Sequence, residues 1–249
     1  MRAPLAIVLG FAALPLQAAH PLLTEETGTQ GAGNLQVEIN FDATRDRTPT
    51  GLIRSGQLNT ILSYGITETL DVQIGLPYLS RSTDAGAGSA VVRGRGDAAV
   101  DFKWRFFEKD GFSIGVKPGG TLASGDAQRR LGQGRNTYRT ILIFDQKSGG
   151  LDFNGHLGAR RNSNTVGERP KLYEISAATL YQAAEKTKLI LEMSMSRQPD
   201  PALRANPATA LLGIIYSPTK SLDLDTGLRR ALNHAAADHG FGAGLTIRW

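Results

Sequence analysis

The chain contains no cysteine, and it has no apolar run long enough to cross a membrane as a helix. Without cysteine there are no disulfide bonds, no thiolate metal sites and no cysteine nucleophile. A spanning helix needs about 18 consecutive apolar residues, and no internal segment reaches that length. Glycine, by contrast, is abundant, at 29 of 249 residues. Because the glycines do not form low-complexity repeats, they suit tight turns and strands that bend.

Alternation of apolar and polar residues dominates the rest of the sequence. Between residues 57 and 78, apolar side chains such as Leu70, Val72 and Ile74 occupy every second position, with small or polar residues between them. A short polar break divides this stretch into two runs. Period-2 alternation predicts strands with two different faces, and a short polar break between two such runs predicts a hairpin.

The same unit recurs to the C-terminus and predicts twelve strands. Their gaps are alternately short and long, and the strand at 208–216 is apolar on both faces, which leaves its register open. The predicted strands are 35–42, 57–66, 70–78, 100–106, 112–117, 138–145, 151–160, 173–182, 189–196, 208–216, 222–229 and 241–249. The predicted long loops are 45–54, 81–95, 124–137, 161–171, 198–207 and 231–239.

An even number of strands, with short turns at one end and long loops at the other, is typical of outer-membrane barrels. Strand edges cannot stay unpaired in lipid, so the sheet must close. Aromatic residues near the strand ends are consistent with interfacial girdles. The sequence therefore predicts an all-β, transmembrane, antiparallel up-and-down β-barrel of about 12 strands over residues 34–249, in the cell outer membrane, with both termini in the periplasm.

The N-terminus has the features of an export signal. Arg2 precedes a short apolar core at 5–16, and small residues at Ala18 and Ala19 follow it. We expect residues 1–19 to be a cleaved signal peptide; an uncleaved anchor helix is the alternative. Residues 20–33 are polar and show no periodicity. They are expected to form a periplasmic tail that can enter the lumen from below as a partial plug.

Charged side chains of both signs fall on the face opposite the apolar one, which is predicted to line the lumen. In a narrow barrel such groups must pair or stay hydrated, because an unpaired buried charge is costly. They form either an ion-pair network or a constriction that selects solutes, and both interpretations stay open. The predicted lumen-lining residues are Asp71, Asp101, Lys103, Arg105, Lys117, Arg139, Asp152, His156, Arg160, Glu174, Glu192, Asp223, Asp225, Arg229 and Arg248.

The long gaps carry an excess of arginine, and the whole chain has a net charge of +5. Arginine binds phosphate well through its planar fork of donors. The outer rim is therefore predicted to face outer-membrane lipid and the phosphorylated headgroups of lipopolysaccharide; solvated loop charge is the alternative. Nucleic acid is a poor candidate, since the basic residues sit on separate loops of an exported chain.

Signals for an enzyme are weak. His156 is the one histidine within a predicted strand, and the residue two positions later is Gly158 rather than a serine. Asp238 and His239 lie in a predicted outer loop, where they would need a second acidic pair to serve a barrel protease. We predict no catalytic residue, no cofactor and no metal site.

Short motifs along nearly all of the mature chain resemble the outer-membrane family named for the meta-cleavage pathway of phenol degradation. The resemblance implies a barrel that passes hydrophobic or aromatic compounds, and it implies no site residues. Where members of that family often have Pro-Thr-Gly-Asp, this chain has Ala-Ser-Gly-Asp. The matching segments are 20–22, 27–31, 64–67, 70–71, 96–97, 103–105, 125–126 and 132–134.

The leading hypothesis is an outer-membrane channel or transporter for the passive passage of small solutes, including hydrophobic or aromatic compounds. Two alternatives stay open. One is a barrel hydrolase that acts on lipid or peptide, and the other is a structural or adhesion barrel whose lumen stays shut.

Overall fold

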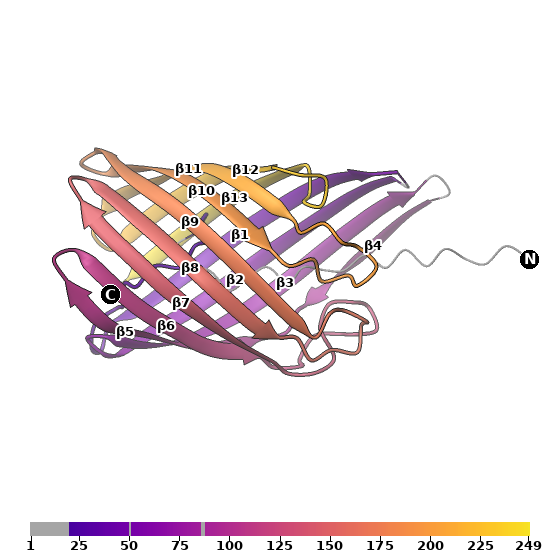
Figure 1. Ribbon diagram of the computed structural model, residues 1–249, viewed down its shortest axis with the longest axis horizontal. Helices are drawn as coiled ribbons and strands as arrows, with labels where there is room; N and C mark the ends of the chain where they lie inside the picture. The colour runs from indigo at the N-terminus through magenta and orange to yellow at the C-terminus, as the bar shows by residue number, and fades with distance from the viewer. Residues whose placement is uncertain (1–19, 50, 86–87) are drawn as a thin grey trace, which may run out of the picture.

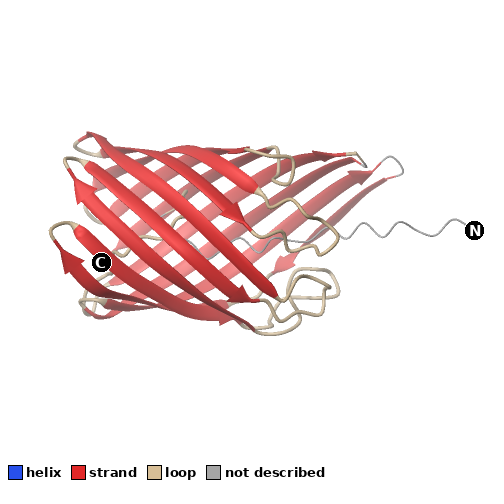
Figure 2. Ribbon diagram, in the orientation of Figure 1, coloured by secondary structure: helices blue, strands red, loops and turns tan. Residues whose placement is uncertain are grey.

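The computed structural model describes residues 20–49, 51–85 and 88–249, as strands joined by turns and loops (Figure 2). The predicted signal peptide, residues 1–19, lies outside these residues. Within the described part of the chain, no helix has the length and apolar character that crossing a membrane requires. The strands are β1 (Leu35–Thr48), β2 (Gly51–Thr67), β3 (Leu70–Ala85), β4 (Gly88–Arg95), β5 (Ala99–Lys109), β6 (Phe112–Thr121), β7 (Thr137–Ser148), β8 (Leu151–Arg161), β9 (Lys171–Ala184), β10 (Thr187–Ser196), β11 (Ala208–Thr219), β12 (Leu222–Ala231) and β13 (His239–Arg248).

The strands form one closed antiparallel barrel (Figure 1). β1 pairs with both β2 and β13, and the pairing of β2 with β3 completes the ring. β3 pairs with β5 over residues 70–75 and with β4 over residues 78–85, so β4 and β5 occupy one position in succession. The thirteen segments therefore fill twelve positions, which confirms the predicted strand number.

The break between β4 and β5 is held by a loop from elsewhere in the chain. The carboxylate of Asp97 accepts backbone hydrogen bonds from Gly125, at 2.8 Å, and from Gln133, at 2.7 Å. The loop also buries Leu131, which is only 2% exposed. These contacts fold the loop between β6 and β7 back over the bend between β4 and β5.

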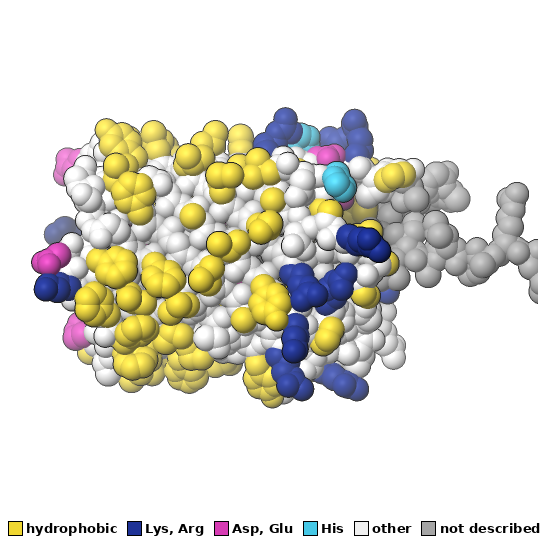
Figure 3. Space-filling model, viewed as in Figure 1, with side chains coloured by type: hydrophobic (Ala, Val, Ile, Leu, Met, Phe, Trp, Pro, Cys, Tyr) yellow, Lys and Arg dark blue, Asp and Glu magenta, His cyan; other side chains and the backbone are white. Residues whose placement is uncertain are grey.

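Neighbouring residues of one strand face two different surroundings. On β10, Leu189, Leu191 and Met193 are 47%, 53% and 57% exposed, whereas Ile190 and Glu192 are 2% and 1% exposed. Figure 3 shows such apolar side chains over the visible face of the barrel wall, with most Lys and Arg of that face at the long-loop end; exposed apolar side chains occur on the other strands as well. An apolar coat of this extent requires lipid around it, and the protein is an outer-membrane barrel.

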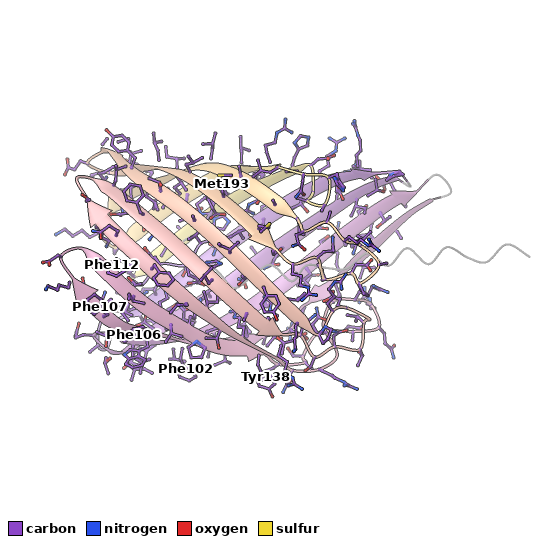
Figure 4. All side chains as sticks on the ribbon, in the orientation of Figure 1. Phe102, Phe106, Phe107, Phe112, Tyr138 and Met193 are labelled. Carbon is purple, nitrogen blue, oxygen red and sulfur yellow. The ribbon has the colours of Figure 1, made fainter. Side chains whose placement is uncertain are left out.

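Aromatic side chains point outward from the wall, as Figure 4 shows for Phe102, Phe106, Phe107 and Tyr138. A register shift between β5 and β6 after Arg105 turns the adjacent Phe106 and Phe107 both outward. At the short-turn end, Trp249 pairs its backbone with Leu35, which places the C-terminus there.

Two predicted loops are wrong. Residues 45–54 mostly belong to β1 and β2, and residues 81–95 mostly belong to the hairpin of β3 and β4. These ends of β1 to β4 project beyond the other strands at the long-loop end (Figure 1), and no regular apolar alternation marks them in the sequence. His239, placed in a predicted loop, is the first residue of β13.

Candidate functional site

Residues 20–33, which we call the lumen tail, run through the inside of the barrel. At the short-turn end, the backbone N–H of Gly33 donates to the carbonyl of Gly65, at 2.9 Å. Farther along, His20, Thr24 and Glu25 are at most 1% exposed. The lumen tail therefore fills the interior over much of its height.

One side of the lumen, formed by β1 and β12, is acidic, and His20 binds it. The ring of His20 hydrogen-bonds through Nδ1 to Asp225, and its Nε2 lies 3.5 Å from the carboxylate of Asp42. The lumen tail, which includes His20, runs inside the barrel and is not part of any membrane-spanning strand. Burial by itself lowers the pKa of His20, but the hydrogen bonds and attraction to Asp225 and Asp42 outweigh it and raise the pKa to about 9. His20 is therefore a cation at neutral pH.

Glycines on β11 and β12 make room for the ring of Pro21. A Cβ added at Gly213 or Gly227 would lie 3.0 Å or 2.9 Å from that ring. On β13, a Cβ at Gly242 would lie 2.9 Å from the ring of His20. Any larger residue at these positions would push the lumen tail away from the wall, so the glycines form a seat for it.

A second side of the lumen, formed by β9, β10 and β11, carries an apolar cluster beside the polar groups of Ser176 and Glu192. Leu22 is 3% exposed and packs there. The inner face of this side is less polar than predicted. Leu211 points inward, against Leu22, and Leu212 points to lipid, which explains why the register of 208–216 was open. The cluster consists of Leu22, Ala178, Leu180, Ile190, Leu211 and Ile215.

A third side, formed by β5 to β8, is basic around the buried side chains of Lys103 and Lys117, and Glu25 binds it there. Its carboxylate lies 2.6 Å from Nζ of Lys117 and 3.9 Å from Nζ of Lys103. Burial raises the pKa of Glu25, but attraction to the two ammonium groups outweighs that effect and leaves the pKa below its ordinary value. The backbone N–H of Glu25 donates to Nδ1 of His156, at 3.0 Å.

Carboxylates of the wall also accept backbone hydrogen bonds from the lumen tail. Glu192 accepts from the N–H groups of residues 23 and 24, at 2.6 and 3.1 Å. Asp145 accepts from Thr27, at 2.6 Å, and Asp71 accepts from Gln30, at 3.1 Å. Backbone donors inside a protein must be satisfied, so these carboxylates replace a strand partner for an extended segment.

The structure distributes the predicted lumen-lining residues over four places. Those that contact the lumen tail are Asp71, Lys103, Lys117, His156, Glu192, Asp225 and Arg229. Asp101 and Arg139 form a bidentate buried pair, with N–O distances of 2.9 and 2.5 Å. Arg105, Asp152, Asp223 and Arg248 lie toward the short turns, where Arg248 pairs with Asp223 at 2.7 Å. Arg160 and Glu174 lie between the lumen tail and the long loops.

Sequence reasoning missed the partners on the lumen tail. His20, Leu22 and Glu25 belong to a segment without periodicity, so no local signal pointed to them. Asp42 and Asp145 lie on strand faces that the alternation predicts to be inward, and this was the signal that could have found them.

A cavity of about 370 Å³ lies between the lumen tail and the long loops. We call it the vestibule. Charged groups such as Arg160, Glu174 and Arg229 share its lining with apolar side chains such as Ile53 and Leu172. The vestibule can therefore accept a solute with an apolar body and a polar or charged group.

The two histidines considered as catalytic candidates, His156 and His239, have other partners among the described residues. His156 is the cross-strand partner of Ser176, but the Ser176 hydroxyl bonds to Thr24 and His156 accepts from Glu25. His239 contacts Arg230. No three side chains of the metal-ligating types gather in a possible metal site within the described ranges.

Comparisons with known proteins agree with this architecture. The COG4313 outer membrane channel from Pseudomonas putida F1 superposes with a TM-score of 0.72 at 14% identity, covering 90% of this chain and 98% of that one. The NanC porin gives 0.57 at 7% identity, covering 86% and 98%. The KdgM porin in complex with disordered oligogalacturonate gives 0.56 at 10% identity, covering 85% and 98%. These likenesses show the fold.

A search of curated proteins finds no match. The family model described as "Putative MetA-pathway of phenol degradation" matches residues 20–249, which include the lumen tail and the whole barrel. The chain belongs to this family of outer-membrane barrels.

Proposed function

We propose that the protein is an outer-membrane channel for the passive passage of small solutes with hydrophobic or aromatic parts, and that the lumen tail is its plug. The observation that carries this proposal is the way the lumen tail bridges three walls of the lumen. His20 meets the acidic wall, Leu22 the apolar wall and Glu25 the basic wall. The proposal is supported by the family description, which refers to phenol degradation.

A plug held mainly by ion pairs and hydrogen bonds can leave, because water can hydrate the polar groups that it uncovers. Leu22 is the apolar contact that must also break when the plug leaves. The mixed lining of the vestibule also suits entry of a solute that is partly apolar.

A reversible cross-link tests the plug. Thr24 and Ser176 hydrogen-bond through their hydroxyl oxygens, so Thr24→Cys with Ser176→Cys places two thiols in contact in a chain that has no other cysteine. We expect liposomes with the oxidised variant to show no solute-dependent swelling, and reduction to restore the swelling of the unmodified protein. Each single variant is the matched control.

A second variant removes residues 20–33 while keeping residues 1–19 in front of residue 34. It should swell faster than the full chain. No solute-dependent swelling with or without the lumen tail would contradict the channel and favour a structural barrel with a shut lumen.

We further propose that the barrel has no hydrolytic activity. His156 and Ser176 are both engaged by the lumen tail, which supports this. His156→Ala and His239→Ala should leave turnover of envelope lipids and peptides at the background level of the native protein. Loss of a measurable hydrolysis in either variant would contradict it.

A lipid partner fits the outer rim of β8, β9 and β10. Arg161 and Lys171 are exposed cross-strand partners, and the guanidinium of Arg197 lies 5.7 Å from the ring centroid of Tyr173. Tyr173 belongs to the apolar coat, so the three cations lie at the boundary of that coat nearest the long loops. Within the described residues none of the three pairs with a carboxylate. This supports contact with the phosphates of lipopolysaccharide in the outer leaflet.

Binding of lipopolysaccharide by the purified barrel tests this partner. Changing Arg161, Lys171 and Arg197 together to glutamine should weaken it by about tenfold or more. The matched control changes Arg129, Arg135 and Arg204, which are exposed loop residues. Equal loss in both sets, or equal binding of dephosphorylated lipopolysaccharide, would contradict the proposed contact.

A further inference from the structure

The two lysines that hold Glu25 are buried in the wall of the channel. Lys103 is 5% exposed and Lys117 is 0% exposed, and the Glu25 carboxylate lies within 4 Å of both ammonium groups. A buried cation keeps its charge only with a compensating anion or water nearby. When the plug leaves, a solute anion can take the position of the Glu25 carboxylate.

The wall around the lysines also carries carboxylates. How strongly each of them competes with a solute for the lysines depends on the ion pairs that it already makes. Asp101 is held by Arg139 in a bidentate pair. Asp71 and Glu38 compete for both lysines, because each carboxylate attracts both ammonium groups. Lys117 is the ammonium group nearest to Glu25, at 2.6 Å, so it is the first contact that an incoming carboxylate would replace.

An apolar site lies within reach of the lysines. Leu22 packs against the apolar wall, and it precedes Glu25 by three residues, a span of at most about 10 Å. The Cα atoms of Leu22 and Glu25 are therefore separated by a distance of the same order as the length of a small aryl-alkyl carboxylic acid.

We infer that Lys103 and Lys117, together with the apolar wall at Leu180, Ile190 and Leu211, form the binding site for an apolar monocarboxylate solute, whose place residues 22–25 occupy in the closed channel. This inference rests on the proposed function and adds the substrate class to it. The carboxylate binds the ammonium groups, and the hydrocarbon part covers the apolar wall. A rising solute concentration then competes with the plug and opens the channel.

The experiment compares 3-phenylpropanoate with 3-phenylpropanol, which have the same apolar body with and without the charge. Block of ion current through the barrel lacking residues 20–33 measures the affinity for each. We expect the carboxylate to bind about tenfold or more tightly than the alcohol, as expected for contacts to a charged group. In the full chain, the carboxylate should raise the opening frequency and the alcohol should not.

Lys103→Met with Lys117→Met should abolish the preference for the carboxylate. Lys117→Gln alone should weaken the preference, and it provides the test if the double variant does not fold. Lys117→Arg, which keeps the charge, should retain the preference. The matched control is Lys188→Gln, a half-exposed lysine that pairs with Asp152.

The two proposals fail in different ways. Current without a preference for the carboxylate, or a preference that survives in the double lysine variant, overturns the inferred site and leaves the channel intact. The absence of current through both the full chain and the tail-deleted barrel overturns the channel itself.

Discussion

The outward and inward faces of the barrel wall are built from the same strands, yet they follow different rules. Outward positions are apolar on every strand that the apolar band crosses, as at Leu191 and Met193 of β10. Inward positions differ from wall to wall: β1 and β12 carry the carboxylates that bind His20, β9 to β11 carry the apolar cluster around Leu22, and β5 and β6 carry the lysines that bind Glu25. Lipid is one uniform partner, whereas the lumen tail is a sequence with its own order of groups. The inner walls are complementary to that order.

The strongest test of the inner face concerns its buried ion pair. Asp101→Ala leaves the Arg139 guanidinium buried without its bidentate partner, and it should lower the free energy of unfolding by about 3–5 kcal/mol. Urea unfolding in lipid bilayers measures this loss. The matched control is Asp84→Ala, which removes the partner of Arg54 in an exposed pair and should change little. Equal effects in the two variants would contradict the difference between inside and outside.

A charge moved between the two faces of one strand tests the outer face. Leu191→Arg places a guanidinium in the middle of the apolar coat and should destabilise the barrel by about 2–4 kcal/mol. Ser194→Arg, on the lumen face of the same strand, should cost less, since the charge there meets polar groups and water. Heat-dependent mobility on gels and urea unfolding measure both. The reverse order of cost would show that the assigned faces are inverted.

The sequence predicted the outer face well because lipid demands the same apolar alternation everywhere, and Phe102, Trp104 and Phe106 followed it without a miss. It did not predict the strand ends in 45–54 and 81–95, since no regular apolar alternation marks them. It placed residues 20–33 in a tail that can enter the lumen, but it gave no partners for Glu25 or His20, because their contacts join residues 92 to 205 positions apart. Strand 208–216 was ambiguous for a physical reason, namely that Leu211 faces another apolar residue inside the barrel.

The contact of His20 with Asp225 and Asp42, which we call the His20 clamp, should weaken as pH rises. The pKa of His20 in the docked state is about 9, above the ordinary value of 6.5, so the docked lumen tail binds more protons than the undocked one between these values. Docking is strongest below about pH 6.5 and weakens as pH rises, by up to about tenfold per unit until pH 9. Channel opening recorded from pH 6 to 10 should increase over that window. His20→Asn should flatten the profile, and an unchanged profile in that variant would contradict the clamp.

A methyl group in the glycine seat should give the smallest effect. Gly227→Ala brings a Cβ to 2.9 Å from the ring of Pro21 and should weaken docking of the lumen tail by about 1–3 kcal/mol, with the barrel itself intact. The expected readout is more frequent channel opening at unchanged barrel stability. The control is Gly56→Ala, where the nearest atom to the added Cβ lies 3.9 Å away. More frequent opening in both variants would show that the seat has no special role.

The division of the wall into a lipid face and a lumen face can be measured directly by single-cysteine labelling along β10, since the chain has no cysteine of its own. A fluorophore placed in turn at positions 189 to 195 of the barrel in bilayers with brominated acyl chains reports contact with lipid. The structure predicts strong quenching at 189, 191, 193 and 195 and weak quenching at 190, 192 and 194. Uniform quenching, or strong quenching at the even positions, would contradict it.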